Sequence, residues 1–126
     1  MTISFNDLKI VNTKVNLLPY KSEPTDDWTP ITEAGDDCDS YATAKYSRLV
    51  QYGWPKSALR LATCWCFPNH EGYHAVLLVD WDGTTYVLDN RYPLPMEHDL
   101  LPYEWHKLQV AGTQQWEWAK DADRST

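Results

Sequence analysis

The sequence has few cysteines, few basic residues and no long apolar stretch. Its 126 residues include 3 cysteines, an odd and small number that excludes a disulfide framework and favours synthesis in a reducing compartment. No run approaches the roughly 20 apolar residues that cross a bilayer, so we expect no membrane insertion. The first residues, MTISFNDLKIVN, lack the basic and apolar regions of a secretory signal. We therefore expect a cytoplasmic or virion-associated protein, or a periplasmic one if a signal has been removed.

Basic residues are outnumbered by acidic ones, 11 to 18, and the formal net charge is -7. A nucleic-acid-binding protein needs a basic surface to neutralise phosphates, so we expect no nucleic-acid partner. The composition is 43% hydrophobic and 13% aromatic, which is enough for a packed core. The length predicts one domain over residues 1–126.

Apolar spacing predicts two helices in the first half of the chain. Residues 4–18 place apolar side chains three and four positions apart, with Ser4 or Asn6 as the N-cap. A second helix runs from residue 37 or 38 to about Tyr52, because Gly53 and Pro55 end it. Between the two helices, residues 19–36 contain three prolines and read as a surface loop.

Strand patterns dominate the second half. Residues 57–67 predict a strand, and residues 73–90 predict a hairpin that turns at Asp82-Gly83. Residues 101–110 and 113–120 add a last pair of short strands. Helices followed by strands indicate an α+β fold, in which the N-terminal helices pack on an antiparallel β-sheet.

This order of elements brings three reactive residues to one end of the sheet. Cys38 lies at a helix N-terminus, His74 near the start of the first hairpin strand and Asp89 at the end of the second. The start of one strand lies beside the end of its hairpin partner. Cysteine, histidine and aspartate together are the nucleophile, base and orienting group of a thiol hydrolase. The alternative is an inert, buried Cys38.

Carboxylates surround the predicted nucleophile in the run GDDCDS, residues 35–40. We expect Asp36, Asp37 and Asp39 to raise the pKa of the Cys38 thiol and so to suppress the thiolate. The first turn of a helix and a protonated His74 can offset that charge. The same run can also be only a solvated cluster at a helix start.

The segments VNTKVNLLPY, DWTPITEAGDDCDSYATAKY, GWPKSALRLA, YHAVLLV and YVLDN, in this order, resemble the bacterial transglutaminase-like cysteine proteinases. The resemblance covers residues 8–92. It implies a papain-like α+β fold and an endopeptidase that acts on protein or peptide substrates through an acyl-enzyme. The implied catalytic residues are Cys38, His74 and Asp89, and Trp28 is implied to line the cleft or to help position the oxyanion.

The resemblance also implies calcium. In the adhesin-releasing members of the family, acidic residues beside the cysteine bind this ion, and Asp37 and Asp39 match those positions. Ser40 replaces a carboxylate of the family pattern. Calcium requires several oxygen ligands, so a weaker site, or none, is equally compatible with the sequence.

Three alternatives stay open. The run CWCFPNHEGYH holds Cys64, Cys66, His70 and His74, which have the chemistry of zinc ligands but not the spacing of a common zinc module. Two buried thiols on either side of Trp65 are the simpler interpretation. The fold can also serve as a non-catalytic binding or virion-associated module, or as a transglutaminase or deamidase.

Overall fold

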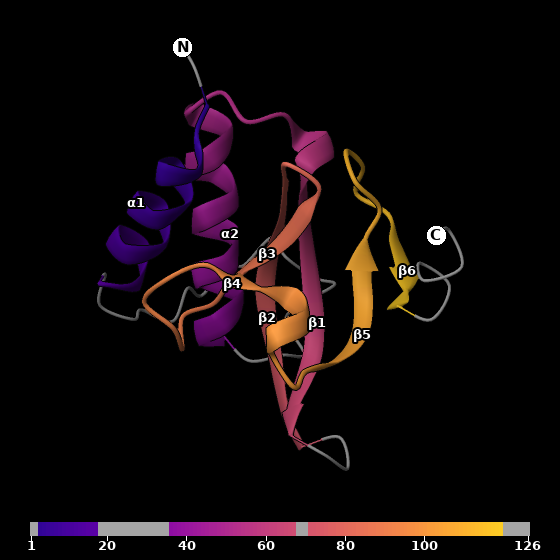
Figure 1. Ribbon diagram of the computed structural model, residues 1–126. Helices are drawn as coiled ribbons and strands as arrows, with labels where there is room; N and C mark the ends of the chain where they lie inside the picture. Colours follow the sequence, from indigo (N-terminus) through magenta and orange to yellow (C-terminus); the bar gives the residue numbers. More distant parts are fainter. Residues whose placement is uncertain (1–2, 18–35, 68–70, 120–126) are drawn as a thin grey trace.

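The computed structural model describes residues 3–17, 36–67 and 71–119 (Figure 1). Two helices precede the sheet, α1 (Phe5–Asn16) and α2 (Asp36–Gln51). The strands are β1 (Leu59–Phe67), β2 (Glu71–Trp81), β3 (Thr84–Leu88), β4 (Met96–Glu97), β5 (Glu104–Gln109) and β6 (Trp116–Trp118). Short 3-10 turns, η2 (Lys56–Ala58) and η3 (His98–Leu100), precede β1 and follow β4.

Local hydrogen bonds fix the start of α1 and the end of α2. At the start of α1 the Ser4 backbone N–H donates to Asp7 Oδ2 (3.0 Å), as expected for an N-cap residue. At the end of α2 the Gly53 N–H donates to the Val50 carbonyl and the Trp54 N–H to the Leu49 carbonyl, both at 3.0 Å. Gly53 has φ +101°, the left-handed conformation of this helix ending. Both predicted helices are confirmed, whereas most of the predicted loop 19–36 lies outside the described residues.

The strands form one antiparallel sheet in the order β4-β3-β2-β1-β5-β6. The predicted hairpin is β2 and β3, and both Asp82 (φ 51°) and Gly83 (φ 80°) adopt positive φ, as a tight two-residue hairpin turn requires. The predicted last pair is β5 and β6. The sequence analysis missed β4, because a two-residue strand carries no alternating pattern.

Each face of the sheet carries its own apolar cluster. The face toward α1 and α2 buries Leu61, Leu77 and Val79 against Leu8 and Leu49. The opposite face buries Cys64, Cys66, Val76, Leu78, Val87, Tyr103 and Leu108. The predicted α+β architecture, helices on an antiparallel sheet, is therefore confirmed. No helix in the described part of the chain is long and apolar enough to cross a membrane.

The short third strand leaves part of β2 unpaired on one side. β3 pairs with β2 only from Leu77 to Trp81, so residues 71–76 of β2 have no β3 neighbour. His74 lies in this stretch. After Leu88 the chain turns away from the sheet and runs toward α1 (Figure 1). This turn begins with Asp89.

Candidate active site

His74 and Asp89 form a buried pair. His74 Nε2 lies 2.7 Å from Asp89 Oδ1, and the side chains are 9% and 0% exposed. The predicted convergence of these residues on the β2–β3 hairpin is present in the structure. Since Nε2 contacts the carboxylate, Nδ1 is the ring nitrogen that faces other partners.

Two further donors hold the Asp89 carboxylate. The Tyr103 hydroxyl donates to Asp89 Oδ2, and the Arg91 backbone N–H donates to Asp89 Oδ1 (2.9 Å). Burial works to raise the pKa of Asp89, but the hydrogen bond and charge of His74, with the donors of Tyr103 and Arg91, outweigh it and lower the pKa. Burial and then the Asp89 carboxylate raise the pKa of Tyr103, so its hydroxyl remains a donor. The site therefore favours an ionised Asp89.

The turn that begins at Asp89 is held by two asparagines of α1. Asn16 Nδ2 donates to the carbonyls of Asp89 and Tyr92, both at 3.1 Å. Asn12 Nδ2 donates to the carbonyls of Tyr92 (3.0 Å) and Pro93 (3.1 Å). Asn12 is fully buried. These four bonds fix the turn, and hence Asp89, against the first helix.

Cys38 lies in the first turn of α2, as predicted for a nucleophile at a helix start. It precedes Gln51 by 13 residues, about 20 Å along a helix. The strand β1 begins at Leu59, near the end of α2, and runs back along the helix. A length of about 20 Å along this strand reaches about Trp65. Cys64 and Trp65 pair with His74 and Tyr73. The first turn of α2, which contains Cys38, thus lies toward the end of the sheet where β1 ends and β2 begins, and Figure 1 shows α2 and these strands in this arrangement.

Several predicted site residues lie outside the described part of the structure. Trp28 belongs to residues 18–35. Of Cys38, Asp37 and Asp39 the structure describes only the helical backbone. Among the described side chains, no group of three or more histidine, cysteine or acidic residues could hold a metal ion.

The cysteines of the competing zinc set are core residues. Cys64 is 0% and Cys66 5% exposed, and both pack in the apolar cluster on the face opposite α2. The simpler interpretation, two buried thiols on either side of Trp65, is therefore confirmed. His70, the other residue of that set, lies outside the described residues.

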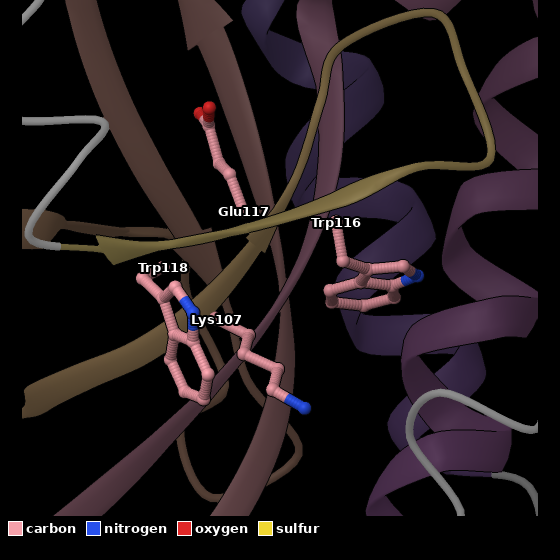
Figure 2. A pocket seen from close by; sticks show the side chains of 4 residues that line it. All are labelled: Lys107, Trp116, Glu117 and Trp118. Carbon is pink, nitrogen blue, oxygen red and sulfur yellow. The ribbon is translucent and has the colours of Figure 1, made fainter.

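A second surface lies at the other edge of the sheet. Lys107, Trp116, Glu117 and Trp118 line a pocket of about 340 Å³ on β5 and β6 (Figure 2). Figure 2 shows the two tryptophans on one side of β6 with Lys107 between them, and Glu117 pointing away. The Lys107 Nζ lies 5.1 Å from the Trp118 ring centre, and Trp118 is 49% exposed.

An aromatic row connects this pocket to the β1–β2 hairpin. The His106 ring lies 5.2 Å from Trp118 and 4.5 Å from Trp65, centre to centre. Tyr73 contacts both Trp65 and His106, and its hydroxyl lies 2.9 Å from His106 Nδ1. Tyr73 directly precedes His74 in β2, so the row runs from the strand that carries His74 to the edge strand β6.

Two helices on an antiparallel sheet, a cysteine in the first turn of one helix and a buried His–Asp pair on the adjoining hairpin are the arrangement of a thiol hydrolase. Residues 3–125 match the family model described as bacterial transglutaminase-like cysteine proteinase BTLCP. The chain belongs to this family and is a cysteine peptidase of the transglutaminase-like type.

Solved structures of Legionella pneumophila LapG share the fold. One is 23% identical over 95% of this chain and 71% of that chain, with a TM-score of 0.69. A calcium-bound form gives a TM-score of 0.70 at 23% identity, over 91% of this chain and 68% of that chain. An EGTA-treated form gives 0.63 at 23% identity, over 92% and 72%. None of the curated proteins searched matches the sequence significantly.

The sequence analysis missed the residues that support the pair. Tyr103 comes from the connection before β5, and no spacing linked it to Asp89. Asn12 and Asn16 are four residues apart and so share one side of α1, a signal that could have drawn attention to them. Lys45, in α2, follows Cys38 by two helical turns and is also buried, although the apolar pattern of the helix gave no reason to bury a lysine.

Proposed function

We propose that the protein is an endopeptidase that uses Cys38 as nucleophile, His74 as general base and acid, and Asp89 as the residue that orients His74. The observation that carries the proposal is the buried 2.7 Å contact between His74 Nε2 and Asp89 Oδ1. It leaves His74 Nδ1 for the thiol of Cys38, whose backbone lies at the same end of the sheet.

In the proposed reaction His74 Nδ1 takes the proton of the Cys38 thiol, and the sulfur attacks the scissile carbonyl carbon. The backbone N–H of Cys38, at the helix start, is a donor for the oxyanion. The carbon–nitrogen bond then breaks, and His74 returns the proton to the leaving amine. Water, deprotonated by His74, attacks the thioester and releases the carboxylic acid and the Cys38 thiol. Asp89 stays ionised and keeps Nε2 protonated throughout.

Calcium is the cofactor that fits the predicted ligands. Asp36, Asp37 and Asp39 give the first turn of α2 several hard oxygen donors, the chemistry that calcium prefers. One LapG structure is calcium-bound and another EGTA-treated, which supports a role for this ion here. A bound divalent cation would neutralise the carboxylates beside Cys38 and so favour its thiolate. Asp37 and Asp39 are the proposed ligands.

We propose a protein or peptide substrate, part of which contacts the pocket of Lys107, Trp116, Glu117 and Trp118. A half-exposed tryptophan and a lysine offer apolar area and a cation to an extended chain. The aromatic row from Trp118 to Tyr73 supports this placement, because it connects the pocket to the strand that carries His74.

The cellular compartment of the protein stays a prediction: cytoplasm or virion, or periplasm if a signal has been removed.

The decisive experiment measures the rate of alkylation of Cys38 by iodoacetamide against pH, with mass spectrometry to assign the modified cysteine. We expect a reactive thiolate well below pH 8.5, the ordinary pKa of a free cysteine, and its loss in His74→Ala. His98→Ala, an exposed histidine outside the site, is the control and should match the wild type. If Cys38 reacts with the same pH midpoint in the wild type and in His74→Ala, the proposed pairing of Cys38 with His74 is overturned.

Peptide cleavage and acyl transfer are separated by a second assay. With fluorescein-labelled casein, a peptidase releases fragments, and Cys38→Ala abolishes the release. Incorporation of a primary amine into casein without fragmentation would instead identify a transglutaminase, and would contradict the endopeptidase assignment while leaving the three residues in place.

A further inference from the structure

The two oxygens of the Asp89 carboxylate are held by different groups. Oδ1 accepts from His74 Nε2 (2.7 Å) and from the Arg91 backbone N–H (2.9 Å). Oδ2 accepts from the Tyr103 hydroxyl. An ionised carboxylate has no hydrogen to donate, so the hydrogen of this bond comes from the tyrosine. In the part of the chain that the structure describes, no other group donates to Oδ2.

The groups around Asp89 differ in what they fix. The Arg91 N–H belongs to the turn that begins at Asp89, so it moves together with the carboxylate. Asn16 bonds to the backbone carbonyl of Asp89 and leaves the side-chain torsions of the aspartate free to rotate. Tyr103 comes from the segment that enters β5. Its hydroxyl therefore ties the carboxylate itself to a separate part of the fold.

The register of the sheet brings Tyr103 next to His74. β5 pairs with β1 through Trp105 and Cys64, and the same Cys64 pairs with His74 in β2. The rings of Tyr103 and His74 meet nearly edge to face, with centres 6.3 Å apart and an interplanar angle of 84°. Tyr103 thus contacts both members of the buried pair, His74 with its ring and Asp89 with its hydroxyl.

Packing alone does not explain the hydroxyl of Tyr103. The residue is 8% exposed and lies in the apolar cluster on the sheet face away from α2. A phenylalanine would fill nearly the same space and would bury no polar atom. The hydrogen bond to Asp89 offsets the cost of burying the hydroxyl, and at the same time it sets the direction of the carboxylate.

We propose that Tyr103 is a positioning residue of the active site, whose hydroxyl holds Asp89 Oδ2 so that Oδ1 stays directed at His74 Nε2. Tyr103 acts through Asp89 and touches no reacting atom. With Oδ1 held in place, the imidazole keeps one orientation while its other nitrogen, Nδ1, takes and returns the proton. The inference rests on the proposed role of Asp89 in orienting His74.

The test removes the hydroxyl alone. In Tyr103→Phe the ring keeps its contact with His74, but Asp89 Oδ2 loses its donor. We expect kcat for fluorescein-labelled casein to fall about tenfold or more, as for a lost hydrogen bond to a charged group, with KM unchanged within about twofold. Tyr86→Phe, a half-buried tyrosine of β3, is the matched control and should keep the wild-type kcat.

A double-mutant cycle shows whether the hydroxyl acts through Asp89. In Asp89→Asn the carboxylate is already absent, so the addition of Tyr103→Phe should change kcat by less than about twofold. The same tenfold loss in both backgrounds would mean that Tyr103 acts independently of Asp89, and would overturn the proposal. Circular dichroism at the assay temperature checks the fold. An unfolded Tyr103→Phe would make the hydroxyl a structural requirement and would overturn the proposal as well.

The two proposals fail in different ways. If Asp89→Asn keeps the wild-type kcat, Asp89 does not orient His74 and the proposed function fails. If Asp89→Asn loses activity while Tyr103→Phe keeps it, only the role of Tyr103 is wrong.

Discussion

Asn16, the last residue of α1, donates a hydrogen bond to the backbone carbonyl of Asp89, 73 residues later in the chain (3.1 Å). The bond joins the N-terminal helix to the turn that carries half of the His74–Asp89 pair. The same amide also reaches the Tyr92 carbonyl (3.1 Å). The first helix therefore supports the candidate site directly, in addition to covering the sheet.

We predict that Asn16→Ala lowers the free energy of unfolding by about 1–3 kcal/mol, since the Asp89 carbonyl loses its asparagine donor and the Tyr92 carbonyl keeps only Asn12. Peptidase activity should fall with it, because Asp89 is less firmly placed. Denaturant unfolding and casein cleavage measure the two effects. Asn6→Ala changes an exposed asparagine of the same helix and should stay within about 0.5 kcal/mol of the wild type. Equal stabilities for the two variants would show that the hydrogen bonds of Asn16 to the Asp89 turn do not stabilise the fold.

Asp89→Asn tests the orienting carboxylate. We expect a loss of at least about a hundredfold in kcat/KM for casein, because an amide can present its N–H to His74 and favour the wrong tautomer. Asp99→Asn, an exposed aspartate in η3, is the control and should retain full activity. An Asp89→Asn variant with unchanged kcat/KM would remove Asp89 from the mechanism.

The lowered pKa of Asp89 also predicts loss of stability in acid. A carboxyl group with a lower pKa in the folded state stabilises the fold above its unfolded pKa, about 3.9, and this contribution disappears as pH falls through the folded pKa. The wild type should thus lose stability relative to Asp89→Asn below about pH 4. Urea unfolding at pH 3 and pH 6 measures the difference. Parallel curves for the two proteins would contradict the lowered pKa.

The lowered pKa of Lys45 predicts that stability changes above neutral pH. Its pKa of about 7 in the folded protein lies below the unfolded value of 10.5, so the unfolded chain binds more protons between these limits and stability rises with pH. The wild type should gain about 2 kcal/mol relative to Lys45→Met between pH 7 and pH 9. Urea unfolding of both proteins at the two pH values gives the difference. A constant difference would mean that Lys45 titrates normally.

Removal of calcium should affect activity through Asp37 and Asp39. We expect EGTA to reduce casein cleavage and added calcium to restore it. In the double variant Asp37→Asn, Asp39→Asn, the calcium concentration that restores cleavage should be at least about tenfold higher. Calorimetric titration of calcium into both proteins measures binding independently of activity. Asp80→Asn serves as the control, since Asp80 is an exposed residue of β2. Activity insensitive to EGTA, together with no calcium binding, would exclude the ion.

Trp118→Ala tests the pocket on β5 and β6. We expect KM for casein to rise several-fold with kcat nearly unchanged, because the side chain contacts substrate away from the reacting carbonyl. Leu94→Ala removes another exposed apolar side chain and should leave KM unchanged. A fall in kcat alone would argue that Trp118 supports the fold and does not bind substrate.

Much of the fold could be predicted because the local signals are strong. Ser4 and Gly53 mark helix ends through their backbone chemistry, and Asp82-Gly83 specifies the hairpin turn whatever surrounds it. The pairing of β5 with β1 could not be predicted in this way. It joins strands about 40 residues apart, and apolar alternation says which face is buried but not which strand is the neighbour.

The sequence by itself determined the two helices, the hairpin and the placement of His74 and Asp89 at one end of it, since a two-residue turn fixes the order of residues along the two strands. Only the tertiary structure decided what surrounds that pair. Tyr103 and Asn16 contact Asp89 from two other segments, 14 and 73 residues away along the chain, because the packing of the helices and strands brings these segments together. Such contacts depend on the whole fold and leave no periodic signal in the residues that make them.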